Sequence, residues 1–362
     1  MSKAAELANL IGNINAGGGG VNRNVVINGA MNVAQRATSA TGVGSGFAYP
    51  TIDRYKIVPS TSGRATMTQT ADGPDGFANC LKLECTTADT SIAATEYFIL
   101  RQSFEGQDLQ HFKKGTSGAE KIIVSFYVKG NAAATYTCEL DDADNTRHNS
   151  QEFSVTTNWT RVILTFDGDT TGAFDDDNAR SLNLDFWLHA GSNYTGGTHT
   201  DNVWHTTTNQ RVGDNQTSFF DSTSRTFFIT GIQMEAKRVT DFEHRSYGDE
   251  LMSCYRYYQQ LDNTVGTVYL GINQAYSTSA VFGMVKDYIV PMRTVPTVGQ
   301  SGNFQFAQSD STAVNAGAIG NLAASNTGWY SGGWTGGSGL VYGGASVLYW
   351  QSGAKLTADA EL

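Results

Sequence analysis

The sequence predicts an all-β protein: a jelly-roll β-sandwich followed by a smaller C-terminal β-sandwich, with a short N-terminal helix and a short linking helix. Among the 362 residues, 40 are Gly and only 5 are Pro, and 11% are aromatic. Only 16% are Asp, Glu, Lys or Arg, against a usual share of about 25%. Segments that alternate apolar and polar residues, separated by turn residues, recur along most of the chain.

The first 22 residues are expected to form a short helix on a flexible tether. Three apolar side chains of residues 2–11 form one helical stripe: Leu7, Leu10 and Ile11. A helix of about ten residues is marginal alone in water, so it needs a surface to dock on. Residues 17–20 are all Gly and predict a tether. We interpret residues 1–22 as an anchor, with a disordered end as the alternative.

Residues 23–245 are predicted to form the jelly roll. Five segments show the alternation of a strand with one face in a core: 122–130, 135–140, 161–166, 181–190 and 226–235. Loops containing Gly, Asn and Asp separate them, and no convincing long amphipathic helix intervenes. Antiparallel strands of this kind are expected to pack as two sheets around one core.

Residues 246–260 are predicted to be a helical joint between two β domains. The surrounding segment, DFEHRSYGDELMSCYRYYQ, combines charges with aromatic side chains, unlike its flanks. Asp249 and Glu250 suit the first turn of a helix. The cysteine of the segment has no evident activating partner, so a structural joint is favoured over a catalytic cluster.

Five residues are predicted to build this joint. Leu251, Tyr255 and Tyr258 fall at i, i+4 and i+7, which predicts a buried helical stripe. Phe242 and Arg245 lie in the corner that follows the last sandwich strand, where an ion pair would fix the direction of the chain.

Residues 261–362 return to strand-like alternation and are predicted to form the second β domain. The alternation is seen in TVGTVYLGI, DYIVPM and SVLYWQ. A glycine-rich loop is expected to interrupt these strands at GWYSGGWTGGSGLVYGG, residues 328–344.

Charge and cysteine usage limit the classes of partner. The net charge of −10, without any Lys/Arg cluster, argues against nucleic-acid binding. The sequence contains no run of about 18 apolar residues, so membrane insertion is not expected. The four cysteines are expected to be free thiols of a protein made in a reducing cytoplasm: Cys80, Cys85, Cys138 and Cys254.

No residue pattern predicts catalysis, a cofactor or a metal site. The sequence has no G-x-S-x-G elbow, and the glycine-rich GVGSGF at 42–47 lacks the Lys and the helix of a phosphate loop. The acidic run Asp175–Asp177 is interpreted as a solvated loop. Calcium binding and a carboxylate pair for glycan cleavage are the alternatives.

Two groups of side chains are candidates for glycan binding. In SLNLDFWLHA, the polar side of the strand would carry Asn183, Asp185, Trp187 and His189. A Trp among hydrogen-bonding groups can stack on a sugar, or pack against a neighbouring subunit. The glycine-rich loop offers Trp329, Tyr330, Trp334 and Tyr342, which would either face a host surface or fill a subunit interface.

Several segments, taken in order, carry a family resemblance. They are NVVINGAMNVAQRAT (24–38), TIDRYKI (51–57), LRQSFEGQDLQHFKKGTSGAEKIIVSFYVKG (100–130), LNLDFWLHAGSNYT (182–195), ITGIQMEAKRVTDFEHRSYGDELMSCYRYYQ (229–259), YIVPMRTVPTV (288–298) and ADAEL (358–362). The chain resembles structural proteins of marine tailed bacteriophages, the group of fibre-type virion proteins with a carbohydrate-binding-like jelly roll. Residues 229–259 are the most specific part of this resemblance.

The resemblance implies a non-enzymatic virion protein that forms a multimer, commonly a homotrimer. The protein would be made in the cytoplasm of the bacterial host. It would bind other virion proteins through its N-terminus. The β domains would either bind host surface glycan or serve purely as a spacer. A capsid decoration protein with no receptor role is the alternative, and a glycan depolymerase is the third hypothesis.

Overall fold

The computed structural model describes residues 23–264, 266–281, 285–308, 313–336 and 339–362. They form two compact units: one runs to Glu250 and includes Leu362, and the other runs from Leu251 to Glu361. The predicted N-terminal anchor, with Leu7, Leu10 and Ile11, lies outside the described residues. The predicted domain boundaries at 245 and 260 stay predictions.

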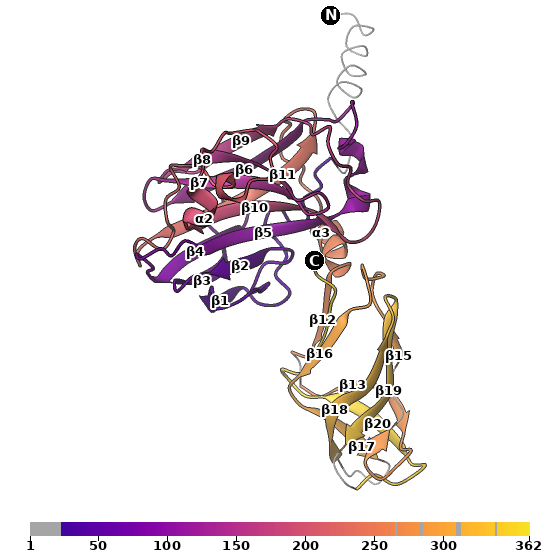
Figure 1. The fold of residues 1–362 in the computed structure, drawn as a ribbon. Coiled ribbons are helices and arrows are strands. Elements are labelled where there is room, and N and C mark those ends of the chain that lie inside the picture. The colour runs from indigo at the N-terminus through magenta and orange to yellow at the C-terminus, as the bar shows by residue number, and fades with distance from the viewer. Residues whose placement is uncertain (1–22, 265, 282–284, 309–312, 337–338) are drawn as a thin grey trace, which may run out of the picture. The chain divides into compact units, whose positions relative to one another are not determined.

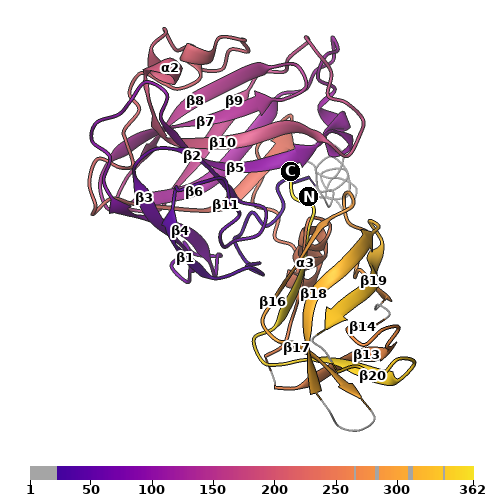
Figure 2. The same cartoon turned by 60° about the horizontal axis from the view of Figure 1, so that its bottom comes forward.

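The first unit is a β-sandwich of two antiparallel sheets (Figures 1 and 2). The six-stranded sheet has the order β1 (Ser39–Val43), β3 (Arg64–Thr70), β4 (Cys80–Thr87), β11 (Thr226–Ala236), β6 (Ile122–Gly130) and β9 (Thr160–Phe166). The five-stranded sheet has the order β2 (Lys56–Ser60), β5 (Tyr97–Glu105), β10 (Arg180–Ala190), β7 (Ala134–Asp142) and β8 (Arg147–Val155). The predicted all-β jelly-roll class is confirmed.

The core of this unit lies between the two sheets. On β10, every second residue enters it: Leu182, Leu184, Phe186 and Leu188. The Phe126 ring of β6 contacts that of Phe186, with 5.0 Å between centroids, so the two sheets meet through aromatic pairs. Each such side chain stabilises the folded state by about 1.5–3 kcal/mol through burial.

Helices in the first unit are short connections. They are η1 (Gly106–Asp108), η2 (Gln110–Phe112), α2 (Ser192–Thr195) and η3 (Thr208–Gln210). In the described part of the chain, no helix has the length and apolar character needed to span a membrane. The four cysteines are buried free thiols, as the sequence predicts.

A lysine ammonium group lies inside a cage of oxygen atoms beside the second 3₁₀ turn. Lys114 Nζ is 2.6 Å from Asp142 Oδ2 and 3.2 Å from Asp169 Oδ2. It also donates to the carbonyl oxygens of Thr171 and Gly172, at 2.9 and 2.7 Å. The side chain is only 2% exposed. A buried charge is tolerated when it is paired and hydrogen-bonded in this way.

The helix α3 (Tyr247–Tyr255) is the linking helix that the sequence predicts. Ser246 Oγ accepts a hydrogen bond from the backbone N–H of Asp249, which caps the first turn. Glu250 accepts a hydrogen bond from the backbone N–H of Asn28 and lies 3.6 Å from Arg245. The start of α3 is therefore tied to the N-terminal segment of the first unit.

The predicted buried stripe of this helix is wrong in part. The helix ends at Tyr255, and Tyr258 is the first residue of β12 (Tyr258–Asp262). Leu251 and Tyr255 are half-buried, whereas Cys254 and Tyr257 are fully buried. Phe242 lies outside the helix, with its ring 4.9 Å from that of Phe77. The role of these residues as a joint stays a prediction.

The second unit also contains two antiparallel sheets. The three-stranded sheet has the order β12, β21 (Lys355–Asp359) and β16 (Thr297–Ser301). The larger sheet has the order β13 (Val268–Gln274), β20 (Ala345–Trp350), β17 (Phe304–Gln308), β18 (Ala313–Ala324), β19 (Gly328–Gly336) and β14 (Ala280–Val281), and β15 (Val285–Asp287) pairs with β19. Side chains from both sheets share one core.

The glycine-rich stretch of this unit is not a loop over its first half, contrary to the sequence-based expectation. Residues 328–336 form β19, and Trp329 and Trp334 belong to the core. The Trp334 ring lies 5.2 Å from the ring of Phe304, centroid to centroid. The large indole rings gain more from burial than a short glycine-rich stretch gains from flexibility.

Replacing Lys114 with Met is expected to destabilise the protein by about 3–5 kcal/mol, because Asp142 and Asp169 lose their buried counter-charge. The burial of Asp169 favours its neutral form. Hydrogen bonds from Arg147 and the Thr171 backbone, together with Lys114, nevertheless hold its pKa below the ordinary value. Urea unfolding at neutral pH measures the loss.

The neighbouring Lys113→Met substitution is the matched control. The Lys113 side chain is 54% exposed and pairs with Glu120 at the surface, so its loss is expected to cost less than about 1 kcal/mol. Equal unfolding free energies for the two variants would contradict the stabilising role assigned to the buried Lys114 ammonium group.

Candidate functional site

The outer face of the five-stranded sheet carries the candidate site. Side chains at paired positions of an antiparallel sheet lie on the same side. Asp185 of β10 pairs with Arg101 of β5 and with Glu139 of β7, and Asn183 pairs with Asp141. The strand register therefore collects polar side chains from three adjacent strands on the side opposite the core.

Arg101 and Asp185 form the central ion pair of this face. Arg101 Nε donates to Asp185 Oδ1 at 2.7 Å and Nη2 to Oδ2 at 2.5 Å, which is a bidentate arrangement. Arg101 Nη2 is also 3.5 Å from Asp141 Oδ2. Asn183 Nδ2 donates to the same oxygen of Asp141 at 2.9 Å.

Arg211 forms the second bidentate pair. Its Nε and Nη2 donate to the two carboxylate oxygens of Glu139 at 2.8 and 2.7 Å. Nη2 is 3.5 Å from Asp141 Oδ1, so Asp141 lies between the two guanidinium groups. Two guanidinium groups face three carboxylates, so the ionised network carries one negative charge in excess.

The pKa values of Asp141 and Asp185 are shifted in opposite directions. Burial disfavours the charge of Asp141, but His148, Arg211 and Arg101 outweigh it and hold its pKa well below the ordinary value. Burial raises the pKa of Asp185, and the bidentate bond from Arg101 offsets this rise only in part. The two carboxylates differ because Asp141 borders the pocket, whereas Asp185 is fully buried.

Aromatic rings border these charges. Trp187 Nε1 donates to Glu139 Oε2 at 2.8 Å, and the Arg211 guanidinium lies 5.1 Å from the centre of the Trp187 ring. The Tyr194 ring is 5.1 Å from that of Trp187 and 5.5 Å from that of Tyr97. Hydrogen bonds and ring contacts thus fix the orientation of the indole.

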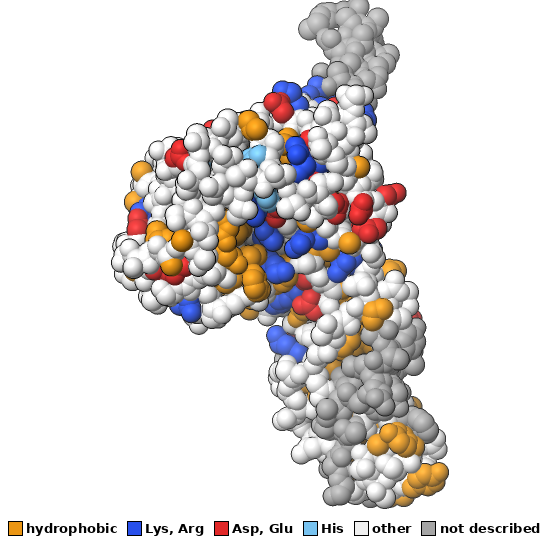
Figure 3. Space-filling view, in the orientation of Figure 1, with side chains coloured by type: hydrophobic (Ala, Val, Ile, Leu, Met, Phe, Trp, Pro, Cys, Tyr) orange, Lys and Arg blue, Asp and Glu red, His pale blue; other side chains and the backbone are white. Residues whose placement is uncertain are grey.

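These groups enclose a pocket of about 330 Å³. Its lining residues are Phe47, Val58, Tyr97, Ile99, Arg101, Asp141, Trp187, Tyr194 and Arg211. On the face that carries β5, hydrophobic side chains lie directly beside Lys and Arg side chains (Figure 3). The volume is at the lower end of the range for small-ligand sites, about 300–1,000 Å³.

The structure places Asn183, Asp185 and Trp187 on the predicted side of the strand but below the surface. The prediction is wrong for His189, because a β-bulge after Trp187 pairs it with Phe98 of the core, and its ring packs on Phe220 of the core. Asn183, Asp185 and His189 are 0% exposed and Trp187 is 1% exposed. Of the four, Trp187 reaches the pocket wall. Asn183 and Asp185 support the wall from beneath through their bonds to Asp141 and Arg101. The glycan role assigned to all four stays a prediction.

Sequence reasoning missed five of the pocket residues that carry polar or aromatic groups: Phe47, Tyr97, Arg101, Tyr194 and Arg211. Tyr97 and Arg101 share one side of β5, so the alternation in YFILRQSFE was a usable signal. Tyr194 and Arg211 come from α2 and the end of η3, where no periodic pattern marks them.

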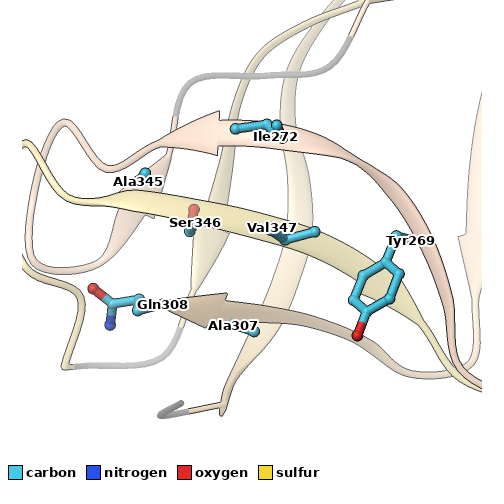
Figure 4. A pocket seen from close by; sticks show the side chains of 7 residues that line it. All are labelled: Tyr269, Ile272, Ala307, Gln308, Ala345, Ser346 and Val347. Atoms are coloured by element: carbon cyan, nitrogen blue, oxygen red, sulfur yellow. The ribbon is translucent and has the colours of Figure 1, made fainter. Parts of the chain in front are cut away.

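The C-terminal candidates do not form one aromatic surface. Trp329 and Trp334 are buried in the core of the second unit, and Tyr342 is 76% exposed. The side chain of Tyr330 lies outside the described part of the structure. A separate hollow of about 520 Å³ opens on the larger sheet, lined by Tyr269, Ile272, Ala307, Gln308, Ala345, Ser346 and Val347 (Figure 4).

The acidic run Asp175–Asp177 is exposed, as a solvated loop would be. Asp177 Oδ1 accepts a hydrogen bond from the backbone N–H of Ala179, which closes a turn. Elsewhere in the described residues, Asp89, Glu96 and His189 lie close enough together to hold a metal ion.

Comparisons with solved structures return carbohydrate-binding modules and parts of larger proteins. One described as CBM4 matches with a TM-score of 0.31 and 9% identity, over 58% of this chain and 98% of its own. The family 11 carbohydrate-binding module from Clostridium thermocellum, in complex with a β-1,3-1,4-mixed-linked tetrasaccharide, matches with a TM-score of 0.28 and 10% identity. This match covers 57% of this chain and 99% of the module. The tailspike protein 4 enzymatically active domain of bacteriophage CBA120 matches with a TM-score of 0.31 and 12% identity. This match covers 59% of this chain and 21% of the tailspike chain.

At these TM-scores and identities, nothing about function follows from the matches. No family model matches the chain, and no curated protein does.

The fall of stability in acid is expected to depend on Asp141. Its folded-state pKa lies below the unfolded value of about 3.9, so the carboxylate stabilises the fold above that pH. This contribution is lost as the pH falls through the folded pKa. Asp141→Asn is therefore expected to flatten the decline of the unfolding free energy between about pH 5 and pH 2. Urea unfolding at a series of pH values measures it.

Asp175→Asn serves as the control, because Asp175 is exposed and no guanidinium group is seen against it in the described residues. It is expected to keep the wild-type slope. An Asp141→Asn slope as steep as that of the control would contradict the assignment.

Proposed function

We propose that this protein is a non-enzymatic structural protein of a bacteriophage particle, of fibre type, which binds host surface glycan through the pocket of its first unit. The observation that carries the glycan proposal is the pocket itself. Aromatic rings and bidentate-paired arginines line the same hollow of about 330 Å³.

Sugars suit this combination of groups. The apolar face of a sugar ring packs on an aromatic ring, and its hydroxyls both donate and accept hydrogen bonds. Tyr97 and Tyr194 supply ring surface, Arg101 and Arg211 supply donors, and Asp141 supplies an acceptor. The ion pairs hold these groups in position before a ligand arrives, which lowers the entropy cost of binding.

Binding is favoured over cleavage by the state of the carboxylates. Glycoside hydrolysis needs a general acid that holds its proton near neutral pH. The pKa of Asp141, which lines the pocket, is lowered instead of raised. Asp185 has a raised pKa, but it is fully buried and bonded to Arg101, so a sugar does not reach it.

The virion role rests on the ordered resemblance of the sequence to fibre-type phage proteins. In this proposal, residues 1–22 attach the chain to other virion proteins. A capsid decoration protein with no receptor role is the competing hypothesis, and it gives the pocket no part in infection.

Self-association through the larger sheet of the second unit is part of the proposal. A β-bulge between Tyr269 and Gly271 turns Tyr269 and Ile272 to the same side, where Figure 4 shows them lining the hollow together with Val347 and Ala307. Ile272 is 83% exposed, and among the described residues no charged side chain lines the hollow. Because the chain carries a net charge of −10, an uncharged face is where copies of it can meet without repulsion.

Tyr97→Ala is expected to weaken glycan binding by roughly twofold to tenfold, through the loss of ring stacking. A glycan array of host surface polysaccharides, followed by titration of each hit, gives the affinity. Tyr342→Ala, at an exposed tyrosine of the second unit, is the matched control and is expected to bind as the wild type does. A loss confined to Tyr342→Ala would move the site to the second unit, and no hit for the wild type would overturn the glycan proposal.

Ile272→Lys is expected to reduce the assembly to monomers, because a charge in an apolar interface must be desolvated. Sedimentation velocity of the full chain measures the assembly state. Ile289→Lys places the same charge on another exposed isoleucine of this unit, and it is expected to assemble normally. A monomeric wild type would overturn the self-association proposal.

A density map of the intact particle tests the virion role. Density for this protein projecting from the tail or the capsid, with its N-terminus at the base, is expected. A flat position against the shell, together with unchanged infectivity of a Tyr97→Ala phage, would favour the decoration protein. Absence of the chain from purified particles would overturn the virion role.

A further inference from the structure

Three side chains of the first unit converge at the end of β10, outside the glycan pocket. They are Asp89 and Glu96, from the connection between β4 and β5, and His189. One ligand atom of each lies within 4.8 Å of the others. Asp89 and His189 are buried, and Glu96 is half-buried.

His189 has a buried ring nitrogen with no partner. The side chain is 0% exposed, and Nδ1 lies 2.8 Å from Ser218 Oγ. Nε2 makes no hydrogen bond, and the Glu96 carboxylate is 4.0 Å from it, too far for one. Buried polar atoms without partners are rare, and each has a physical cause.

Neither tautomer of His189 satisfies this nitrogen. Ser218 Oγ accepts a hydrogen bond from the backbone N–H of Phe220 and can also accept one from Nδ1–H. Nε2 then presents a bare lone pair to two carboxylates, which repel it unless a cation lies between. With the proton on Nε2 instead, the N–H finds no acceptor within reach. A bound cation removes both problems.

The two carboxylates are held in place to receive a cation. Asp89 Oδ2 accepts hydrogen bonds from Thr61 Oγ1 at 2.7 Å and from the backbone N–H of Ser62 at 3.0 Å. Glu96 Oε2 accepts one from the backbone N–H of Ala93 at 2.6 Å. Supporting bonds of this kind orient the ligands of metal sites.

We propose that Asp89, Glu96 and His189 bind a divalent transition-metal ion, of which Zn²⁺ is the best fit. One imidazole nitrogen and two carboxylate oxygens are a ligand set that Zn²⁺ takes, with water in the fourth position. Ca²⁺ fits less well because it takes six to eight oxygen ligands. Ligands at about 2.0–2.2 Å from a tetrahedral Zn²⁺ lie about 3.3–3.6 Å apart, so the three side chains close inward around the ion. The ion would join the β4–β5 connection to β10.

Zn²⁺ titration of the full chain, after treatment with a chelator, tests the proposal. Calorimetry is expected to show one tight Zn²⁺ equivalent, and thermal unfolding is expected to shift upward with Zn²⁺ and not with Ca²⁺. Glu96→Gln keeps an acceptor for Ala93 but removes the charge, and it is expected to weaken this equivalent at least about tenfold. Glu84→Gln, at an exposed carboxylate of β4, is the matched control and is expected to bind Zn²⁺ as the wild type does.

Crystals soaked in a zinc salt locate the ion directly. An anomalous difference peak between Asp89, Glu96 and His189 is expected. A peak found only elsewhere, such as at His148 and His205, whose rings are 5.9 Å apart, would overturn the proposal. The same holds if wild type and Glu96→Gln bind Zn²⁺ equally, if the wild type binds none, or if Ca²⁺ alone binds.

Discussion

The bidentate ion pair between Arg101 and Asp185 is the interaction on which the candidate site depends. Asp185 is fully buried in the middle strand of the five-stranded sheet, and an unpaired carboxylate there would cost several kcal/mol. Arg101 offsets that cost and, in reaching Asp185, also approaches Asp141. The polar wall of the pocket is therefore fixed by a requirement of folding, and the same geometry makes it ready to bind.

The first unit meets the same electrostatic problem in three places and solves it with three kinds of cation. Arginines neutralise Asp185 and Glu139 on the sheet face, where a planar group can bind both oxygens. A lysine fills the cage formed by Asp142 and Asp169, where a compact charge fits. At Asp89 and Glu96, the described residues place a histidine where the other two sites have an arginine or a lysine. A bound metal ion would supply the positive charge that a neutral histidine lacks.

The two units divide the proposed work according to their surfaces. The first has a rigid, charged hollow that suits a small polar ligand. In the second, the described residues that line the hollow of the larger sheet carry no charge, which suits a protein surface. Its tryptophan rings pack in its own core, so the many aromatic residues of this unit are no evidence for ligand binding.

The sequence by itself determined the β-sandwich class and the direction of most β10 side chains, because the alternation of a strand has a period of two. It also marked the linking helix through Asp249 and Glu250. Only the tertiary structure decided what covers each face. Arg211 and Tyr194 bury Trp187 from outside the sheet, and no local pattern encodes a contact made by a distant connection. Likewise, Trp329 and Trp334 lie in a strand because the core of the second unit can bury their rings. Tyr258 lies in β12 instead of the helix because β12 pairs with β21.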